Sequence, residues 1–345
     1  AFDTVADDKV LPDAINRSTD GDNVPFPSAA IDPTPMENAS CAQTAALCRA
    51  SRLYYLLSTQ RMLVLLIMIG VANIISACSI PGPKAAKNEI AGLQEVTWQV
   101  AADSTMVKGG EGFRMSARIA GNSQGRRIIF IHGTPGQASG WADYLLTVPE
   151  DLEYIAIDRP GFGKSGPVGA IVSLKRQAAA IEHLLVRRGG RWPIIVGHSL
   201  GGPIAARAAA DFPSKVGGLI ILAGSLDPAL EKIELIQKIV RIFALDRLLP
   251  RRMRNANLEL LGLQPELKSL QVKLGGIKCP LTIIHGTKDT LVPYSNVSFM
   301  QRKMKAAQPQ KVLRLDGKMH FLPWLEKPAI DQAIGEMARW TTKSC

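Results

Sequence analysis

The sequence predicts an α/β fold with a mostly parallel central sheet, helices on both of its faces, and a helical cap inserted between two of its strands. From about residue 93 onward, short runs of Ile, Val and Leu alternate with segments of helical periodicity. Strands of this kind are typical of a parallel sheet covered on both faces. The alternation stops over residues 226–276 and then resumes. The core is therefore predicted at residues 93–225 and 277–345, and the cap at 226–276.

The individual elements follow from the apolar period of each segment. Two alternating segments, 96–101 and 113–119, are expected to pair as edge strands. Buried strands are expected at 127–132, 154–158, 194–196, 218–223, 281–285 and 311–315. Core helices are expected at 141–148, 173–188, 204–211, 294–305 and 329–340. In the cap, helices are expected at 231–245 and 257–263, separated by Pro250 and by Arg251, Arg252 and Arg254, which we interpret as a solvated face.

Residues 1–50 are acidic, rich in Asp, Pro and Asn, and lack any sustained period. We expect them to be disordered or to be an extension upstream of the true start, for which Met36 and Met62 are candidates. The chain carries a net charge of +11, so its basic residues lie in the remainder. A basic body suits an anionic membrane surface or ligand. The sequence has no zinc-finger spacing and no RNA-binding signature, so nucleic acid is not an expected partner.

Residues 51–78 have the layout of a secretory signal, with basic residues before an uncharged apolar run. The run ends in Ile75-Ser76-Ala77-Cys78, which resembles the lipobox of bacterial lipoproteins. The resemblance implies cleavage before Cys78, lipid on its thiol, and a place in the bacterial cell envelope, anchored in the membrane and facing out of the cytoplasm. An uncleaved signal anchor and a buried core helix are the alternatives. Residues 79–92 are expected to be a linker.

The stretch Gly197-His198-Ser199-Leu200-Gly201 joins a predicted strand directly to a predicted helix. A Gly-x-Ser-x-Gly sequence in this context is typical of a nucleophile elbow, where a sharp turn lifts the serine hydroxyl clear of the sheet. Ser199 is therefore the candidate nucleophile. The start of the following helix leaves the N–H of Leu200 unpaired and able to meet a developing oxyanion.

A serine nucleophile needs a base, and the base needs an orienting acid. Of five histidines, three close buried strands and one lies within a helix, which leaves His320 in the loop after the last strand. Asp289 follows the preceding strand and is the candidate acid, with Asp227 as the alternative. The chain order Ser199, Asp289, His320 places all three on loops past strand ends.

Five motifs in this order make residues 93–345 resemble the α/β-hydrolase fold family. The resemblance implies that Ser199 is the nucleophile, His320 the general base and Asp289 its orienting carboxylate. It also implies an oxyanion hole formed by the backbone N–H groups of Thr134 and Leu200. The motifs are His132-Gly133-Thr134-Pro135-Gly136, Asp158-Arg159-Pro160-Gly161-Phe162-Gly163-Lys164-Ser165, Gly197-His198-Ser199-Leu200-Gly201-Gly202, His285-Gly286-Thr287-Lys288-Asp289 and His320.

The expected function is a membrane-tethered serine hydrolase that cleaves a small-molecule carboxylic ester without metal or cofactor. No His, Cys or carboxylate cluster in the sequence has metal-ligand spacing. A C–C bond hydrolase or a cofactor-free haloperoxidase-type enzyme is the alternative among enzymes, and an inactive binding protein is the alternative outside them. Epoxide hydrolases and haloalkane dehalogenases share the His-Gly-x-Pro loop but attack with Asp, so Ser199 argues against both chemistries.

Overall fold

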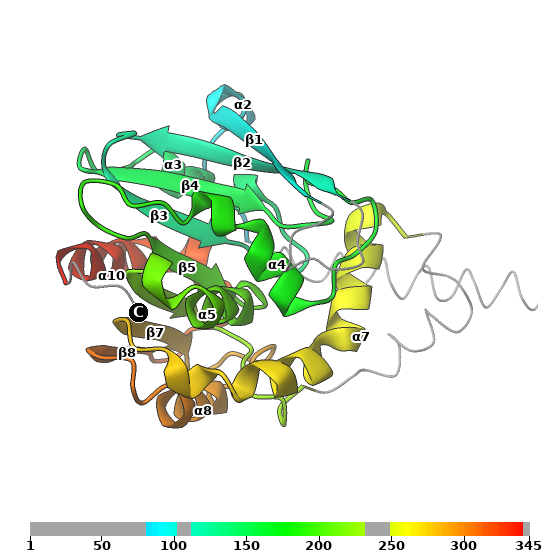
Figure 1. Cartoon of the computed structure of the whole chain (residues 1–345), viewed down its shortest axis with the longest axis vertical. Coiled ribbons are helices and arrows are strands. Elements are labelled where there is room, and N and C mark those ends of the chain that lie inside the picture. The colour runs from blue at the N-terminus through cyan, green and yellow to red at the C-terminus, as the bar shows by residue number, and fades with distance from the viewer. Residues whose placement is uncertain (1–80, 102–111, 232–248, 341–345) are drawn as a thin grey trace, which may run out of the picture. The chain divides into compact units, whose positions relative to one another are not determined.

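The computed structural model describes residues 81–101, 112–231 and 249–340. An eight-stranded sheet lies at the centre, in the order β1-β2-β4-β3-β5-β6-β7-β8 (Figure 1). The β1–β2 and β2–β4 pairs are antiparallel, and the remaining neighbours are parallel. The strands are β1 (Gln94–Val100), β2 (Phe113–Gly121), β3 (Arg126–Ile131), β4 (Leu152–Asp158), β5 (Ile194–His198), β6 (Gly218–Leu222), β7 (Leu281–Gly286) and β8 (Gln310–Leu315).

The inner strands are buried along their whole length, and most of their residues are apolar. Every residue of β3, β4, β5, β6 and β7 is buried, whereas in β1 only the last residue, Val100, is buried. Inner strands therefore have helices against both faces, and β1 lies at the edge of the sheet. This arrangement confirms the predicted fold class.

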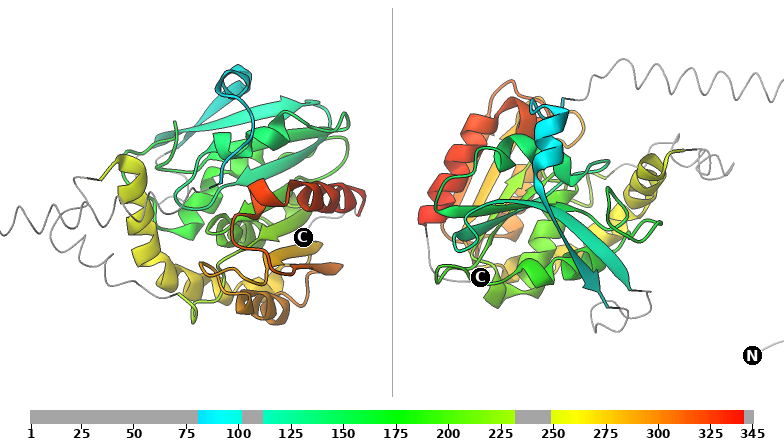
Figure 2. Two further views of the ribbon diagram at one scale, coloured as in Figure 1. Left: turned by 180° about the vertical axis from the view of Figure 1, so that it is seen from behind. Right: turned by 90° about the horizontal axis from the view of Figure 1, so that it is seen from above.

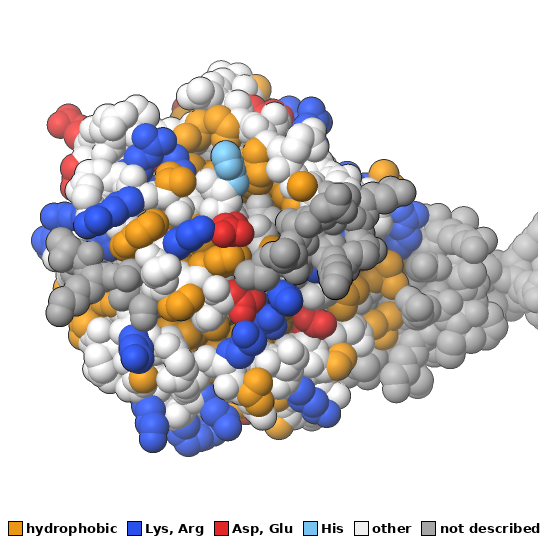
Figure 3. Space-filling view, viewed as in Figure 1, with side chains coloured by type: hydrophobic (Ala, Val, Ile, Leu, Met, Phe, Trp, Pro, Cys, Tyr) orange, Lys and Arg blue, Asp and Glu red, His pale blue; other side chains and the backbone are white. Residues whose placement is uncertain are grey.

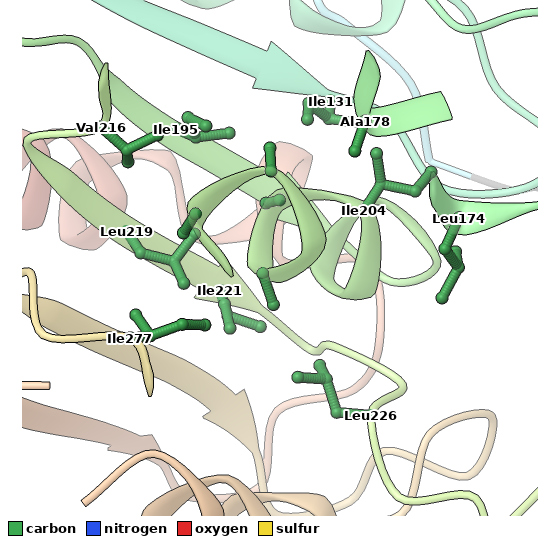
Figure 4. Packing of buried hydrophobic residues seen from close by; sticks show 14 of the residues in the cluster. Ile131, Leu174, Ala178, Ile195, Ile204, Val216, Leu219, Ile221, Leu226 and Ile277 are labelled. Carbon is green, nitrogen blue, oxygen red and sulfur yellow. The ribbon is translucent and has the colours of Figure 1, made fainter. Parts of the chain in front are cut away.

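Two separate hydrophobic clusters lie on the two faces of the sheet. On one face, Ile204 of α5 lies in one cluster with Ile195 and Leu219 of the sheet (Figure 4). Buried residues of α4, α7 and α8 belong to the same cluster. On the other face lie α3 and α10 (Figure 2). Helix α10 buries Ile330, Ala333, Ile334 and Met337, which recur with the period of one helix face.

The helices are α2 (Lys87–Gly92), α3 (Ala142–Leu145), α4 (Leu174–Ala180), α5 (Gly201–Asp211), α7 (Arg251–Gln271), α8 (Ser295–Lys303), α9 (Leu322–Leu325) and α10 (Lys327–Arg339). Short 3₁₀ turns are η1 (Ala138–Trp141), η2 (Glu182–Leu184), η3 (Pro213–Lys215) and η5 (Leu274–Gly276). Among the boundaries that differ from expectation, two involve an added or a divided helix. The segment predicted as a linker ends in α2, and the helix expected at 173–188 divides into α4 and η2.

Helix α7 differs most from the sequence prediction. The prediction separated two cap helices at Pro250 and the arginine cluster, but Arg251 begins a single 21-residue helix that continues through Pro265. The helix bends along its length (Figure 1), as expected where a proline removes one helical hydrogen bond. The segment expected as a helix at 231–245 lies, apart from its first residue, outside the described residues.

The arginines at the start of α7 do not form one solvated face. Arg251 donates to four backbone carbonyls in the loop after β4, at 3.2 Å to Gly163, 2.5 Å to Ser165, 2.9 Å to Pro167 and 3.2 Å to Val168. Arg252 is exposed. On the face seen in Figure 3, Lys and Arg side chains are scattered over the surface and do not gather in one patch.

The segments interpreted as an N-terminal extension and as a signal or anchor, 1–50 and 51–78, lie outside the described residues, and so does Cys78. Within the described ranges, no helix combines the length and the hydropathy that crossing a membrane requires.

Candidate active site

Ser199 lies at the turn between β5 and α5. Its φ of 54° is in the left-handed region, which a serine adopts only where the surrounding structure holds it. A Cβ on Gly197 would come within 2.3 Å of the carbonyl oxygen of Gly201, so the turn closes only with glycine there. The turn leaves Ser199 half-buried at the carboxyl end of a central strand.

His320 and Asp289 lie on loops after β8 and β7 and form a direct pair. The distance from His320 Nδ1 to Asp289 Oδ2 is 2.7 Å, and both residues are buried. The second carboxylate oxygen of Asp289, Oδ1, accepts hydrogen bonds from the backbone N–H groups of Leu291 at 3.0 Å and Val292 at 2.8 Å. An ionised carboxylate only accepts hydrogen bonds, so Nδ1 of His320 donates and Nε2 is left to accept a proton.

The turn at Ser199 contacts the His320 loop through His198. The two imidazole rings have centroids 4.9 Å apart, and Nε2 of His198 donates to the His320 carbonyl at 3.1 Å. Burial lowers the pKa of His198 to about 3, and the charge of His320 acts in the same direction. His198 is therefore neutral near pH 7 and supports the His320 loop rather than exchanging protons.

The loop after β3 lies directly against Ser199. A Cβ on Gly133 would come within 2.8 Å of the Cβ of Ser199. Within the described part of the chain, neither the N–H of Thr134 nor that of Leu200 is paired with an acceptor. Both N–H groups are therefore free to donate to an oxygen bound beside Ser199.

Asp227, the alternative acid, is engaged elsewhere. Its Oδ1 accepts the N–H of Ala229 at 2.9 Å, which closes a local turn, and its own N–H donates to Asn296 at 2.9 Å. The structure thus brings Asp289, rather than Asp227, to His320.

Asp158, the last residue of β4, holds together the loop that follows and also ties it to Ala138 at the start of η1. Burial raises the pKa of Asp158, whose carboxylate accepts the N–H groups of Ala138 at 2.7 Å and Lys164 at 2.9 Å. Both oxygens of the Asp158 carboxylate are therefore used in holding the backbone in place.

Two buried polar residues near the site, Gln177 and Glu259, were not predicted from the sequence. Nη1 of the fully buried Arg159 donates to Gln177 at 2.7 Å and to Glu259 at 2.6 Å. The spacing of Asn255, Glu259 and Leu263 could have indicated that Glu259 lies on the inner face of a helix. Residues four apart share one face of a helix. All three are buried on α7, so this face is the inner one.

The described residues also bear on metal binding and on a cavity outside the Ser199 region. Among the described residues, no group of three or more His, Cys, Asp or Glu could hold a metal ion. A cavity of about 420 Å³ lies away from Ser199, between the end of β1 and η2, and is lined by Trp98, Glu182, His183 and Lys215 among others.

The sheet order and the sharp turn at Ser199 place the chain in the α/β-hydrolase class of folds. Residues 128–330 match the alpha/beta hydrolase family. The chain therefore belongs to this family.

Individual relatives with different activities share parts of this sequence. The dihydrolipoyllysine-residue acetyltransferase component of the acetoin cleaving system of Cupriavidus necator is 33% identical over 100 residues, which are 29% of this chain and 26% of that protein. A 2-hydroxy-6-oxononadienedioate/2-hydroxy-6-oxononatrienedioate hydrolase of Paraburkholderia phymatum is 26% identical over 244 residues, which are 57% of this chain and 83% of that one. The first match thus spans only about a quarter of its relative's length.

A solved structure shares the fold at low identity. The monoacylglycerol lipase of Paleococcus ferrophilus superposes with a TM-score of 0.53 and 16% identity, covering 65% of this chain and 98% of that one. Likeness at this level of identity reflects the common fold.

Proposed function

We propose that the chain is a serine hydrolase that cleaves carboxylic esters through an acyl-enzyme intermediate. The observation that carries the proposal is the 2.7 Å contact of His320 with Asp289, on a loop that the Ser199 turn contacts through His198. A carboxylate in this place fixes the imidazole tautomer and stabilises the imidazolium that forms when Nε2 takes the serine proton.

In the proposed reaction, Ser199 Oγ attacks the ester carbonyl carbon while Nε2 of His320 accepts the hydroxyl proton. The tetrahedral oxyanion accepts hydrogen bonds from the backbone N–H groups of Thr134 and Leu200. The C–O bond to the alcohol then breaks, and His320 returns the proton to the departing oxygen. Water, deprotonated by the same nitrogen, attacks the acyl-enzyme, and the carboxylic acid leaves as Ser199 regains its proton.

The decisive test uses p-nitrophenyl esters of increasing acyl length and a fluorophosphonate probe. We expect hydrolysis by the wild type and labelling of the peptide that contains Ser199. In Ser199→Ala, kcat is expected to fall on the order of 10⁶-fold, with residual rate from binding and oxyanion stabilisation. Ser298→Ala, at an exposed position of α8, is the matched control. Wild-type rates in Ser199→Ala would refute the mechanism.

A C–C bond hydrolase is the second candidate, favoured by the match to the Paraburkholderia phymatum hydrolase over 57% of this chain. The same triad can cleave a carbon–carbon bond beside a carbonyl group. The two functions separate when kcat/KM for the ester series is compared with kcat/KM for a 2-hydroxy-6-oxo-dienedioate. A higher value for the dienedioate would assign the chain to C–C cleavage.

We also propose that the hydrolase is tethered to the bacterial cell envelope through residues 51–78. The support is the sequence, in which an apolar run ends at Cys78 in a lipobox-like segment. Two acyl chains on one cysteine anchor a protein stably, at about 0.8 kcal/mol per buried CH₂. After expression from Met36 or Met62, mass spectrometry should find acyl mass on Cys78, and Cys78→Ala should yield a heavier, unlipidated precursor. A wild type that retains residues 62–77 without acyl mass would refute lipidation.

A further inference from the structure

A buried network joins helix α7 to the loop after β3. Arg159 is 0% exposed and Glu259 is 2% exposed, and their side chains pair through two contacts, Nη1 to Oε1 at 2.6 Å and Nη2 to Oε2 at 3.0 Å. Gln177 donates to Glu259 Oε1 at 2.8 Å. A buried ion pair is tolerated only when its other hydrogen-bonding groups find partners, and Nη1 and Nη2 of Arg159 each donate two hydrogen bonds.

The network holds the loop at two adjacent residues. Nη2 of Arg159 donates to the carbonyl oxygen of Gly133 at 3.0 Å, and Nδ1 of His132 donates to the same oxygen at 2.7 Å. The hydroxyl of Thr134 donates to Oε2 of Glu259 at 2.7 Å. The peptide unit between Gly133 and Thr134 is therefore fixed both at its carbonyl and at the next side chain.

That peptide unit contains the N–H of Thr134. A trans peptide bond is planar, so its C=O and its N–H point in opposite directions. Holding the Gly133 carbonyl toward Arg159 therefore fixes the direction of the Thr134 N–H on the other side. Ser199 adjoins this unit, because a Cβ on Gly133 would lie 2.8 Å from the Cβ of Ser199.

We propose that Glu259 is a positioning residue for the oxyanion hole, and that it couples α7 to the reaction centre through Arg159 and Thr134. The inference rests on the proposed ester hydrolysis. Without the Glu259 carboxylate, the Thr134 hydroxyl loses its acceptor and Arg159 loses its ion pair, so the Thr134 N–H is still present but is held less firmly in one direction. Since an oxyanion donor acts chiefly in the transition state, its misalignment lowers kcat more than it raises KM.

The test compares two buried Arg–Glu pairs. In Glu259→Gln, kcat on a p-nitrophenyl ester should fall about 10-fold to 100-fold with KM little changed, less than the loss of a whole oxyanion donor. A boronic acid, whose serine adduct resembles the tetrahedral intermediate, should bind more weakly by the same factor. Glu153→Gln is the matched control, since Glu153 is equally buried and lies 2.5 Å from Arg127 at the opposite end of the strands. It should lower thermal stability and leave kcat and boronate affinity unchanged.

A second pair of variants, at Thr134, tests the proposal even if the Glu259→Gln protein does not fold. Thr134→Val removes only the hydroxyl contact and should lower kcat and boronate affinity, and Thr134→Ser should restore both. Unchanged kcat and boronate affinity in Thr134→Val, or in a folded Glu259→Gln, would overturn the positioning role while ester hydrolysis by the wild type stands. A wild type that neither hydrolyses esters nor takes up a fluorophosphonate would overturn the proposed function and this inference with it.

Discussion

Each oxygen of the Asp289 carboxylate has a separate partner. Two backbone N–H groups donate to Oδ1, and the His320 imidazole donates to Oδ2. An amide in this position would keep its oxygen toward the two backbone donors, because its NH₂ cannot accept from them. The NH₂ would then face Nδ1 of His320 and favour the tautomer that carries the proton on Nε2.

Asp289→Asn should therefore lower kcat by about 10⁴-fold with the fold intact, since a tautomer with Nε2 protonated cannot accept the serine proton. Ester hydrolysis measures the loss, and circular dichroism checks the fold. Asp227→Asn is the matched control and should leave kcat unchanged, because Asp227 closes its own turn. The opposite ranking of the two variants would move the acid to Asp227.

Helix α7 is attached to the core by polar groups as well as by its apolar face. Arg251 at its start reaches four carbonyls of the loop after β4, and Asn255, one turn later, donates to Gly161 at 2.8 Å. These contacts link the first turns of the helix to the same loop that begins with Arg159.

Arg251→Ala should lower the free energy of unfolding by about 1–3 kcal/mol, because it leaves carbonyls of a partly buried loop unpaired. Urea unfolding gives the difference. Arg252→Ala removes the same charge from an exposed neighbour and should change the free energy by less than about 0.5 kcal/mol. Equal losses in the two variants would mean that charge alone, rather than the contacts, accounts for the effect.

The strands and the residues of the candidate site could be predicted from the sequence because local sequence patterns mark them. Apolar runs such as those at 194–196 and 281–285 place the strands, and Gly197 and Gly201 mark the turn at Ser199. Helix α7 was not accessible in the same way, since Pro265 argues locally against a continuous helix and tertiary packing overrides it. The partnership of Arg159 with Glu259 joins residues a hundred positions apart, and no local pattern encodes it.

At the scale of the whole molecule, three histidines are buried in the core without charge. Burial lowers the pKa of His132, His198 and His285 below the ordinary value of 6.5, to about 3 for His198. The unfolded chain binds these protons near pH 6.5 and the folded chain does not. The resulting stabilisation is complete above that pH and is lost as the pH falls through the lowered pKa of each histidine, which for His198 is about 3.

Thermal unfolding should therefore show a stability that declines from about pH 7 to about pH 5, by at most about 1.4 kcal/mol per pH unit for each histidine. The raised pKa of Asp158 acts with the opposite sign, because the folded chain then binds this proton more tightly than the unfolded chain. His198→Gln should make the decline shallower, and His183→Gln, at an exposed position, should not. Parallel curves for the wild type and His198→Gln would contradict the assignment.

The two outermost strands of the described sheet, β1 and β8, each leave one backbone edge unpaired. Both carry long polar side chains: Glu95 and Gln99 on β1, and Lys311 and Arg314 on β8. Salt bridges tie Lys311 to Glu336 at 2.5 Å and Arg314 to Asp316 at 2.7 Å. Charges along an open edge discourage another chain from adding a strand there. The same sheet that presents a reactive serine at its carboxyl end is thus protected along its sides from growing into an aggregate.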